Sequence, residues 1–386
     1  MMKQSRTINF FDLILEVIFV CFIFLPLFGY IFELDVSGDL GEKRAKARFP
    51  SFKQDTLRTI PEKFDAFYED HFGFRSSLIQ GHNWLKYKFL KSGSVGKVLL
   101  GRDGWLFLTK AESISDYLGL LTFSPQQLAA LKDALEQRRD WLAERGIRYV
   151  FFIAPNKTSI YPEMLPSHIR TRAGRTQMDQ LVEYLRANSD VDFIDLRDKL
   201  CSAKIEGLIY HPRDSHWTDR GAFIVYQNVI GYVSRWFPEI KPMNISDFTI
   251  IWQSRQEDLA LMLGLGRQLA ENVEVFQRRQ PANAHRVALI LPEEYPWPKH
   301  ITAKSQWAME NKYANHRLLF FHDSFGVYGN LRELIAEHFS RTVFIPLRPD
   351  MNCLKMMIEI EKPDIVIEEI VERKLKDPPS KLLEED

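Results

Sequence analysis

The chain has 386 residues, of which 45% are hydrophobic and 26% are charged, a composition typical of a globular protein with one large domain or two modest ones. Lysine plus arginine and aspartate plus glutamate both total 51, so the formal net charge at pH 7 is +0. A neutral chain has no net attraction to polyanions, and this balance argues against nucleic-acid binding.

Residues 10–34 form an almost wholly apolar run. At 1.5 Å of rise per residue, a helix of this length crosses a bilayer. Asp12, Glu16 and Pro26 interrupt the run without removing its apolar character. We therefore predict one transmembrane helix, and a buried core helix is the alternative interpretation.

The charges around this run predict its orientation. Lys3 and Arg6 precede it, and no small-residue cleavage site follows it. The positive-inside rule then favours an uncleaved signal anchor, with residues 1–9 as a cytoplasmic tail and the bulk of the chain outside. Four basic residues between positions 43 and 48 favour the opposite orientation, but they begin several residues beyond the helix.

Polar and short apolar segments follow the anchor. Residues 35–51 are charged and contain glycine, which predicts a linker, and residues 52–386 are expected to form the globular domain. Apolar residues at helical spacing between 52 and 90 predict two helices broken around 71–75. Short apolar runs on either side of the Gly-Arg-Asp-Gly sequence at 101–104 predict a β-hairpin.

From residue 124 onward, helical and strand-like segments alternate. A helix over 125–145 leads to the buried-strand run RYVFFIA at 148–154, and a second helix covers 177–188. This alternation predicts the α/β class, with a parallel sheet flanked by helices. The further strands that we expect lie at 191–196, 287–291, 317–321, 341–345 and 364–367. Apart from an amphipathic segment at 258–263, the stretch 247–312 is interpreted as an irregular insertion.

The three cysteines are scattered along the chain. Cys21 lies in the apolar run, and Cys201 and Cys353 form either one disulfide in an oxidising compartment or two buried free thiols. The spacing of the three cysteines gives no metal site, and no Gly-x-x-x-x-Gly-Lys phosphate loop is present. We predict neither a metal nor a cofactor.

Two polar clusters follow predicted elements of the sheet. In the first, Asp214 and His216 stand two residues apart, just before a helix that Thr218 can cap. In an extended stretch their side chains share one side, so Asp214 can accept the His216 Nδ1 proton and fix the tautomer. The alternative is a loop aspartate and histidine with no shared role.

The second cluster is centred on Ser324, where an apolar strand runs directly into a polar turn and a helix over 330–338. A serine at this junction is exposed at the carboxyl end of a strand, where nearby helical N–H groups can stabilise an oxyanion. A serine that only caps the helix is the alternative. Together with Asp214 and His216, Ser324 completes the set needed for acyl transfer.

These clusters resemble a known family. The sequence Asp-Ser-His-Trp at 214–217 is similar to the D-x-H-W signature, and His-Asp-Ser-Phe at 322–325 to the serine block, of AlgJ/AlgX-like SGNH-hydrolase-type O-acetyltransferases of alginate and related polysaccharides. In this family the Asp/His block precedes the serine, as here, because its SGNH domain is circularly permuted. The resemblance covers roughly residues 52–375. Further similar segments lie at 71–75, 101–107, 155–157, 161–163, 258–260 and 363–373.

The resemblance implies a circularly permuted, SGNH-hydrolase-like α/β domain and a mechanism. Ser324 would form an acetyl-enzyme with His216 as base and Asp214 orienting it, and the acetyl group would pass to a hydroxyl of a bacterial exopolysaccharide. Too few residues follow Arg373 for the carbohydrate-binding module of AlgX-like proteins, so the membrane-anchored AlgJ-like form is the better match. A domain in the periplasm, anchored in the inner membrane, would receive acetyl groups through an MBOAT-type membrane acyltransferase.

The sequence departs from the family pattern around the oxyanion hole. His322 stands where many SGNH proteins have glycine, and no G-x-N-D block supplies the usual asparagine donor. Backbone amides are one alternative. The candidate side chains for binding the oxyanion or the substrate are Arg373, Asn156, Lys157 and Tyr328.

Three alternatives remain open from the sequence. A carbohydrate O-acetylesterase would use the same triad with water as the acceptor. A non-catalytic subunit of a polysaccharide modification or secretion complex would not need the triad. His211 and His322 are rival bases, although neither has a carboxylate two residues upstream.

Overall fold

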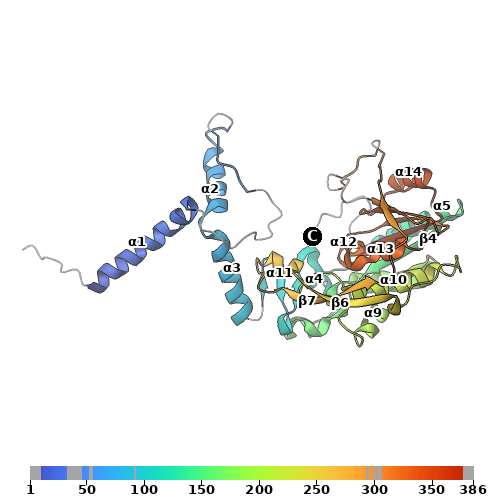
Figure 1. Cartoon of the computed structure of the whole chain (residues 1–386), viewed down its shortest axis with the longest axis horizontal. Coiled ribbons are helices and arrows are strands. Elements are labelled where there is room, and N and C mark those ends of the chain that lie inside the picture. The colour runs from blue at the N-terminus through green and yellow to red at the C-terminus, as the bar shows by residue number, and fades with distance from the viewer. Residues whose placement is uncertain are drawn as a thin grey trace, which may run out of the picture.

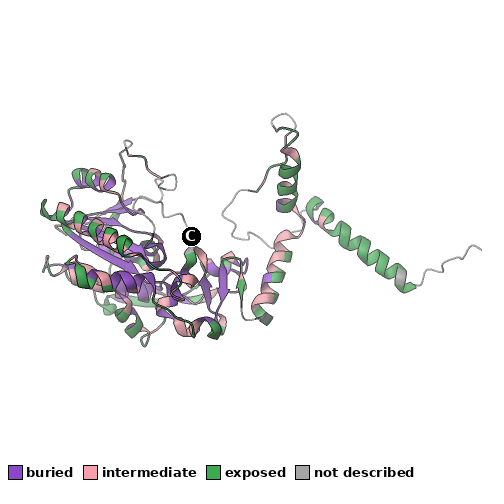
Figure 2. Ribbon diagram, turned by 180° about the vertical axis from the view of Figure 1, so that it is seen from behind, coloured by how far each residue is buried: buried purple, intermediate pink, exposed green. Residues whose placement is uncertain are grey.

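The computed structural model describes residues 10–32, 46–51, 55–90, 93–292, 295–298, 301 and 307–376. The predicted tail at 1–9 and most of the predicted linker at 35–51 lie outside the described residues. Helix α1 (Phe10–Ile31) lies apart from the α/β part of the chain (Figure 1). Its segment Leu13–Ile31 has a mean hydropathy of 2.5 and is long and apolar enough to cross a membrane. Figure 2 shows α1 exposed along most of its length, so the alternative of a buried core helix is wrong.

Helices α2 (Ile60–His71) and α3 (Arg75–Leu85) follow, broken at the predicted place. Gly73 lies in the break, where a Cβ atom would come within 2.0 Å of the Pro26 carbonyl oxygen. Only glycine lets the bend pack this closely against the last turns of α1. At the other end, the Asn83 amide donates to the Leu263 carbonyl and joins α3 to the α/β domain.

A seven-stranded sheet forms the centre of this domain. Its spatial order is β5 (Phe193–Asp195), β4 (Arg148–Ala154), β12 (Ile365–Val371), β10 (Arg317–Phe321), β11 (Arg341–Ile345), β9 (Trp307–Glu310) and β8 (His285–Val287). The first five strands are parallel, and β9 and β8 extend the sheet in antiparallel fashion. The predicted α/β class and the mainly parallel sheet are therefore confirmed.

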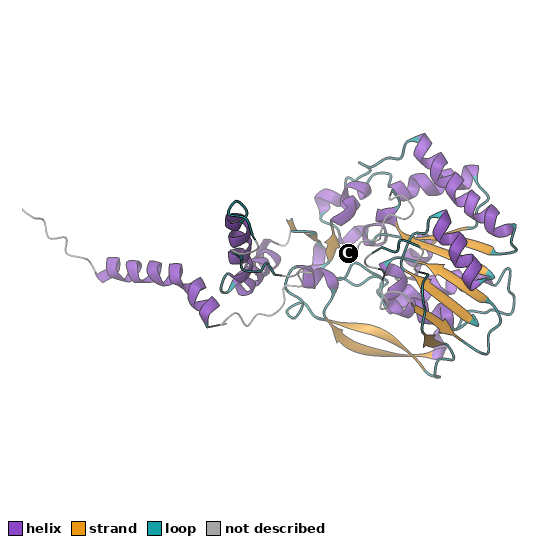
Figure 3. Ribbon diagram, turned by 90° about the horizontal axis from the view of Figure 1, so that it is seen from above, coloured by secondary structure: helices purple, strands orange, loops and turns teal. Residues whose placement is uncertain are grey.

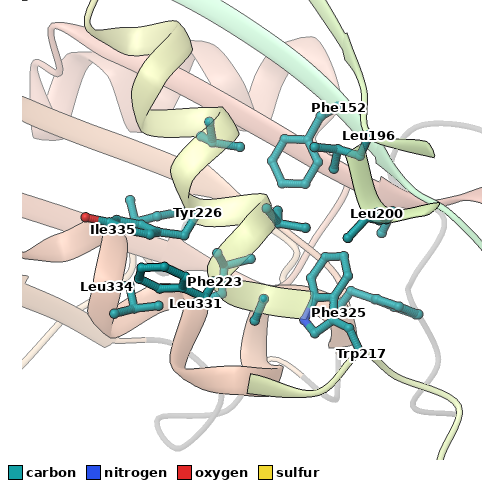
Figure 4. Close-up of a cluster of buried hydrophobic side chains, with 14 of the residues drawn as sticks. Phe152, Leu196, Leu200, Trp217, Phe223, Tyr226, Phe325, Leu331, Leu334 and Ile335 are labelled. Carbon is teal, nitrogen blue, oxygen red and sulfur yellow. The ribbon is translucent and has the colours of Figure 1, made fainter. Parts of the chain in front are cut away.

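Helices cover both faces of the sheet (Figure 3). Side chains of β4 alternate between two apolar clusters, because successive residues of a strand point to opposite faces. One cluster packs under α5 (Pro125–Ala143), α8 (Gln177–Asn188) and α14 (Met351–Glu361). The other packs under α10 (Asp219–Val233), α9 (Arg197–Ala203) and α13 (Leu331–Ala336). Figure 4 shows Phe223 and Tyr226 of α10 beside Leu334 and Ile335 of α13.

A small sheet and several short helices accompany the central sheet. The hairpin predicted around 101–104 is confirmed. Its strands belong to the three-stranded sheet of β1 (Ser94–Val95), β2 (Val98–Leu100) and β3 (Leu106–Leu108). The other short helices are α4 (Ser113–Tyr117), α6 (Lys157–Ile160), α7 (Ser167–Arg170), α11 (Asp258–Met262) and α12 (Ser324–Val327).

The interpretation of 247–312 as an irregular insertion is wrong. The segment holds a long antiparallel hairpin, β6 (Phe248–Arg255) paired with β7 (Glu271–Arg278), with α11 between the two strands. Most of β6 is exposed, so it lacks the apolar pattern by which a buried strand is recognised. The strand predicted at 287–291 lies instead at His285–Val287, and β9, which the sequence did not indicate, pairs with it.

Both cysteines of the domain are free thiols. Cys201 on α9 is exposed, whereas Cys353 on α14 is buried. Of the two alternatives left open by the sequence, the disulfide is not present, and only one of the two thiols is buried.

Candidate active site

Asp214 and His216 lie at the tip of a tight loop. The loop is closed by a β-bridge between Tyr210 and Trp217 and by the Thr218 N–H, which donates to the Ile209 carbonyl. Thr218 then caps α10, as predicted, because its side chain accepts the Gly221 N–H. The loop and the following helix are thus fixed by one residue.

Three elements hold the backbone of this loop from outside. Leu106 of β3 donates its N–H to the Pro212 carbonyl, and Leu259 of α11 donates to the Arg213 carbonyl. The third element is α6, whose Lys157 ammonium donates to the carbonyls of His211 (3.0 Å), Pro212 (3.1 Å) and Asp214 (2.6 Å). Lys157 was a candidate for binding the oxyanion or substrate, but its donors are used by the loop.

Burial of the Lys157 ammonium has an electrostatic consequence. Loss of hydration lowers the pKa of Lys157 to about 8, although the nearby carboxylates of Asp258 and Asp214 oppose this shift. The rings of Trp105 and Phe107 lie 5.5 and 5.1 Å from the ammonium nitrogen. The lysine is therefore a buried cation enclosed by aromatic rings, carbonyls and carboxylates.

The Asp214 carboxylate accepts two hydrogen bonds from His216, one from the backbone N–H at 2.9 Å and one from ring Nδ1 at 2.7 Å. Both side chains are buried. Burial alone would raise the pKa of Asp214, but the hydrogen bond and charge of His216 outweigh it and hold the pKa well below its ordinary value. Asp214 is thus an ionised acceptor that sets Nδ1 as the protonated ring nitrogen.

Ser324 is the first residue of α12, at the carboxyl end of the central strand β10. The capping residue of this helix is Asp323, whose carboxylate accepts the Phe325 N–H at 2.9 Å and the Val371 N–H of β12 at 2.7 Å. The alternative in which Ser324 only caps the helix is therefore wrong. Its hydroxyl is free of the capping role and lies 2.9 Å from His216 Nε2.

The structure thus brings Ser324, His216 and Asp214 into one hydrogen-bonded row. The rival bases lie elsewhere. His322 is fully buried and its Nδ1 lies 2.7 Å from the Asp323 carbonyl, while His211 Nδ1 lies 3.9 Å from Glu257. Burial lowers the pKa of His211 to about 4 and that of His322 to about 3, so both are neutral at pH 7.

Tyr328 stacks on the His216 imidazole. The ring centroids are 3.6 Å apart and the planes differ by 7°. The backbone of Tyr328 is fixed by the Trp217 indole N–H, which donates to the Tyr328 carbonyl at 3.2 Å. Tyr328 therefore contacts the ring that bonds Ser324, although the sequence placed it only among the candidates for the oxyanion or substrate.

The other two candidates, Asn156 and Arg373, lie together beside the loop. With Lys157 and Ser215 they line a hollow of about 20 Å³, large enough for one water molecule. The Arg373 guanidinium carbon lies 5.5 Å from the Phe325 ring centroid. The backbone N–H of Asn156 donates to the buried carboxylate of Glu372 at 2.7 Å.

A second carboxylate, Asp258, lies beside the row, and the sequence assigned it no role beyond a similar three-residue segment. Its Oδ2 is 3.6 Å from His216 Nδ1, and the donor atoms of Asp214, His216 and Asp258 lie within 4.8 Å of one another, close enough to ligate a cation. All four carboxylate oxygens, however, already accept hydrogen bonds from His216, Ser215 or the Asp258 N–H. The three groups are thus engaged with the protein.

Two hollows adjoin the loop, and Arg213 lines both of them. The larger, of about 940 Å³, is lined by the helical turn Lys86–Leu90, which follows α3, and by the Gly-Arg-Asp-Gly-Trp turn at 101–105. The smaller, of about 480 Å³, is lined by the loop and the β6–β7 hairpin, including the exposed Trp252. The larger hollow combines the cations of Lys88 and Arg102 with the exposed ring of Phe89.

Comparison with known families gives one match that covers much of the domain. The family described as SGNH hydrolase-like domain, acetyltransferase AlgX, matches residues 98–293, just over half of the chain. The matched residues include Asp214, His216 and Asp258 but end before Ser324.

Curated relatives include proteins named probable alginate O-acetylase AlgJ. The protein from Pseudomonas aeruginosa is 28% identical over 173 residues, which is 44% of this chain and 41% of the relative. The protein from Pseudomonas putida is 29% identical over 151 residues, 39% of this chain and 37% of the relative. The chain therefore spans about two fifths of the length of these relatives.

Solved structures share the fold. PatB1 of Bacillus cereus, solved with a sulfonyl adduct, superposes with a TM-score of 0.54 at 18% identity and covers 74% of this chain and 97% of that chain. A DHHW family protein from Eubacterium siraeum has a TM-score of 0.53 at 11% identity, over 74% of this chain and 94% of that chain.

Proposed function

This chain belongs to the AlgX family of SGNH hydrolase-like acetyltransferase domains, and we propose that it is an O-acetyltransferase that moves acetyl groups onto hydroxyls of a bacterial exopolysaccharide. The observation that carries the proposal is the hydrogen-bonded row of Ser324, His216 and Asp214. A nucleophile, a base and an orienting carboxylate in this order are what acyl transfer requires.

In the proposed mechanism, Ser324 Oγ attacks the carbonyl carbon of the acetyl donor while His216 Nε2 takes its proton. The imidazolium formed is stabilised by Asp214, which the surrounding hydrogen bonds keep ionised. The donor's leaving group departs with the proton from His216 and leaves an acetyl-serine. A sugar hydroxyl then attacks this ester, again losing its proton to His216, and the acetylated glycan and free serine result.

The acceptor glycan is proposed to lie in the larger hollow beside the loop. Arg213 lines this hollow and directly precedes Asp214, so a chain bound there lies next to the triad loop. The exposed ring of Phe89 offers a face for a sugar ring, and Lys88 and Arg102 offer donors to its hydroxyl or carboxylate groups. The name of the curated relatives, alginate O-acetylase, supports a polysaccharide acceptor.

Location and donor follow from the same proposal. With α1 as a signal anchor in the inner membrane, the domain would lie in the periplasm, where an MBOAT-type membrane acyltransferase would supply acetyl groups. An alkaline phosphatase fused after Asp386 should then be active. An inactive fusion, combined with an active cytoplasmic reporter at the same position, would rule out this orientation.

The decisive experiment separates transfer from the rival functions. Glycan from cells that carry the wild type or Ser324→Ala is compared by mass spectrometry. Loss of acetylation in the variant supports transfer, whereas increased acetylation means that the protein is an esterase. Unchanged acetylation points to a non-catalytic subunit. Asp214→Asn should keep the fold and lower the transfer rate by up to about 10⁴, because the amide misorients the imidazole.

A further inference from the structure

A second carboxylate touches the histidine of the proposed triad from a different element. Asp258 begins α11, and its Oδ2 accepts a hydrogen bond from the Ser215 hydroxyl, which itself lies 3.2 Å from His216 Nδ1. Its Oδ1 accepts the Ser215 N–H at 2.7 Å. In return, the backbone N–H of Asp258 donates to Asp214 Oδ2 at 2.9 Å. One residue is thus bonded to both neighbours of the imidazole.

The groups around Asp258 give it a charge that depends on pH. Burial and the charge of Asp214 raise the pKa of Asp258 to about 6, against the opposing effects of His216 and of the hydrogen bonds from Ser215. Its carboxylate is therefore ionised above about pH 6. The other titratable groups that face this cluster are Lys157, Glu257, Glu271, His211 and Arg255.

We propose that Asp258 is a second carboxylate partner of His216, which positions the ring through Ser215 and Asp214 and stabilises its imidazolium form during acyl transfer. The inference rests on the proposed function, because it assumes that Ser324 is the nucleophile. Asp258 contacts no reacting atom and is a positioning residue.

If Asp258 acts through its charge, its removal should shift the pH dependence of the reaction in a definite direction, which a purely structural role would not do. A negative charge 3.6 Å from Nδ1 stabilises the protonated ring relative to the neutral ring. Removing this charge moves the acid limb of the rate profile to lower pH. It also slows the reaction on the alkaline plateau, because the imidazolium in the transition state loses one partner.

The test uses the full chain in detergent and an aryl sulfonyl fluoride as the probe. Ser324 Oγ forms the new bond to sulfur, fluoride leaves, and His216 takes the serine proton, so intact-mass spectrometry follows the labelling rate from pH 5 to pH 9. Asp258→Asn should move the midpoint of the acid limb down by about one pH unit and slow the plateau rate about tenfold.

Two further variants separate charge from position. Glu257→Gln is the matched control, because burial and Asp214 raise the pKa of Glu257 to about 8 and its carboxyl carries no charge in the acid limb. Its acid limb should coincide with that of the wild type. Ser215→Ala deletes the linking hydroxyl, which is also one of the hydrogen bonds that lower the pKa of Asp258, so it should slow labelling at every pH. On the alkaline plateau, where Asp258 is ionised, the loss measures the hydroxyl alone.

The outcomes discriminate between the two proposals. An Asp258→Asn limb that coincides with the wild-type limb, in protein with an unchanged thermal unfolding curve, overturns the role of Asp258. If this variant does not fold, wild-type labelling rates in Ser215→Ala overturn it instead. Labelling of Ser324→Ala at the wild-type rate would reject the proposed nucleophile, and with it the proposed function.

Discussion

The stack of Tyr328 on His216 gives a prediction that distinguishes two roles for one residue. If the ring acts by stacking, Tyr328→Phe should keep the rate of acetyl-ester hydrolysis within about twofold, and Tyr328→Leu should lower this rate. An aromatic pair contributes about 0.5–1.5 kcal/mol beyond its buried area, and a desolvated cation over a ring contributes about 2 kcal/mol. Because the imidazole becomes a cation in the transition state, we expect a loss of about 1–2 kcal/mol, or about 5- to 30-fold in rate.

If the Tyr328 hydroxyl instead donates to the oxyanion, the pattern reverses. Loss of one oxyanion donor costs about 10²- to 10³-fold, and the phenylalanine variant would already show this loss. The assay is hydrolysis of a small activated acetyl ester by the full chain, with Ser324→Ala as the blank. A hundredfold loss in Tyr328→Phe would refute the stacking role, and full activity in Tyr328→Leu would show that the stack, with its 3.6 Å centroid separation, has no effect on catalysis.

Four further predictions concern stability and binding. Lys157→Met should lower the free energy of unfolding by about 2–4 kcal/mol in urea, because three carbonyls lose a charged donor while the desolvation cost of the ammonium is relieved; a wild-type midpoint would contradict this. Burial and the charge of Arg332 lower the pKa of His322 to about 3. Between about pH 6.5 and pH 3, His322 therefore binds a proton in the unfolded chain but not in the folded protein. On acidification through this range, the free energy of unfolding of the wild type relative to His322→Asn should therefore fall by about 1.4 kcal/mol per pH unit. Plots of unfolding free energy against pH that run parallel for the two proteins would contradict this pKa shift. Phe89→Ala should raise KM for an acceptor oligosaccharide about 5- to 10-fold without changing ester hydrolysis, and an unchanged KM would move the acceptor out of the larger hollow. Arg138→Met should cost about 3–5 kcal/mol in thermal unfolding because Glu368 loses its buried partner, and Arg138→Met combined with Glu368→Leu should recover part of this; a double variant that is less stable than the single one would refute the pairing argument.

The parts of the fold that follow from the sequence are those where local pattern and tertiary burial agree. The strand predicted at 148–154 is β4, buried on both faces, and the helix predicted at 177–188 is α8, which begins at a capping box formed by Thr176 and Asp179. By contrast, the β6–β7 hairpin is held by cross-strand backbone pairing and has a largely exposed first strand. Apolar residues stand at alternate positions only over a few residues of each strand, such as Val273 and Val275 of β7, and this short pattern does not identify the hairpin.

The site, too, has residues that the sequence indicates and contacts that only the fold creates. The spacing of Asp214 and His216 and the strand-to-helix position of Ser324 indicate three side chains that could act together. The hydrogen bonds that join them arise only when α10 and α12 pack on the same sheet. The partners of the loop could not be predicted, because Lys157 and Asp258 come from segments whose residue types alone suggest a ligand contact or an amphipathic helix. Their role depends on which backbone groups the fold places opposite them.

Strand β12 carries buried carboxyl groups that hold neighbouring segments in place, and Glu368 is the first of them. Glu368 is paired with the Arg138 guanidinium by two hydrogen bonds, of 2.9 and 2.7 Å, and accepts the Tyr149 hydroxyl at 2.8 Å. A buried carboxylate so fully paired contributes little net stability compared with apolar residues, but removing either partner is costly. The pairing therefore fixes α5 against the centre of the sheet in one register.

Two further carboxyl groups fix the segments that carry the site. Glu369 lies in β12, and Glu372 begins the helical turn Glu372–Lys374 that follows the strand. Glu369 accepts the Asp323 N–H at 2.9 Å in the turn before Ser324, and burial together with the charge of Asp323 raises the pKa of Glu369 well above its ordinary value. Glu372 accepts the Asn156 N–H directly before Lys157, and burial raises its pKa to about 7. The turn before Ser324 is therefore bonded to β12, and the residue before Lys157 is bonded to the helical turn that directly follows β12. A shift of β12 would move both sides of the Ser324–His216 hydrogen bond, so the geometry of the triad depends on carboxyl groups that never contact it.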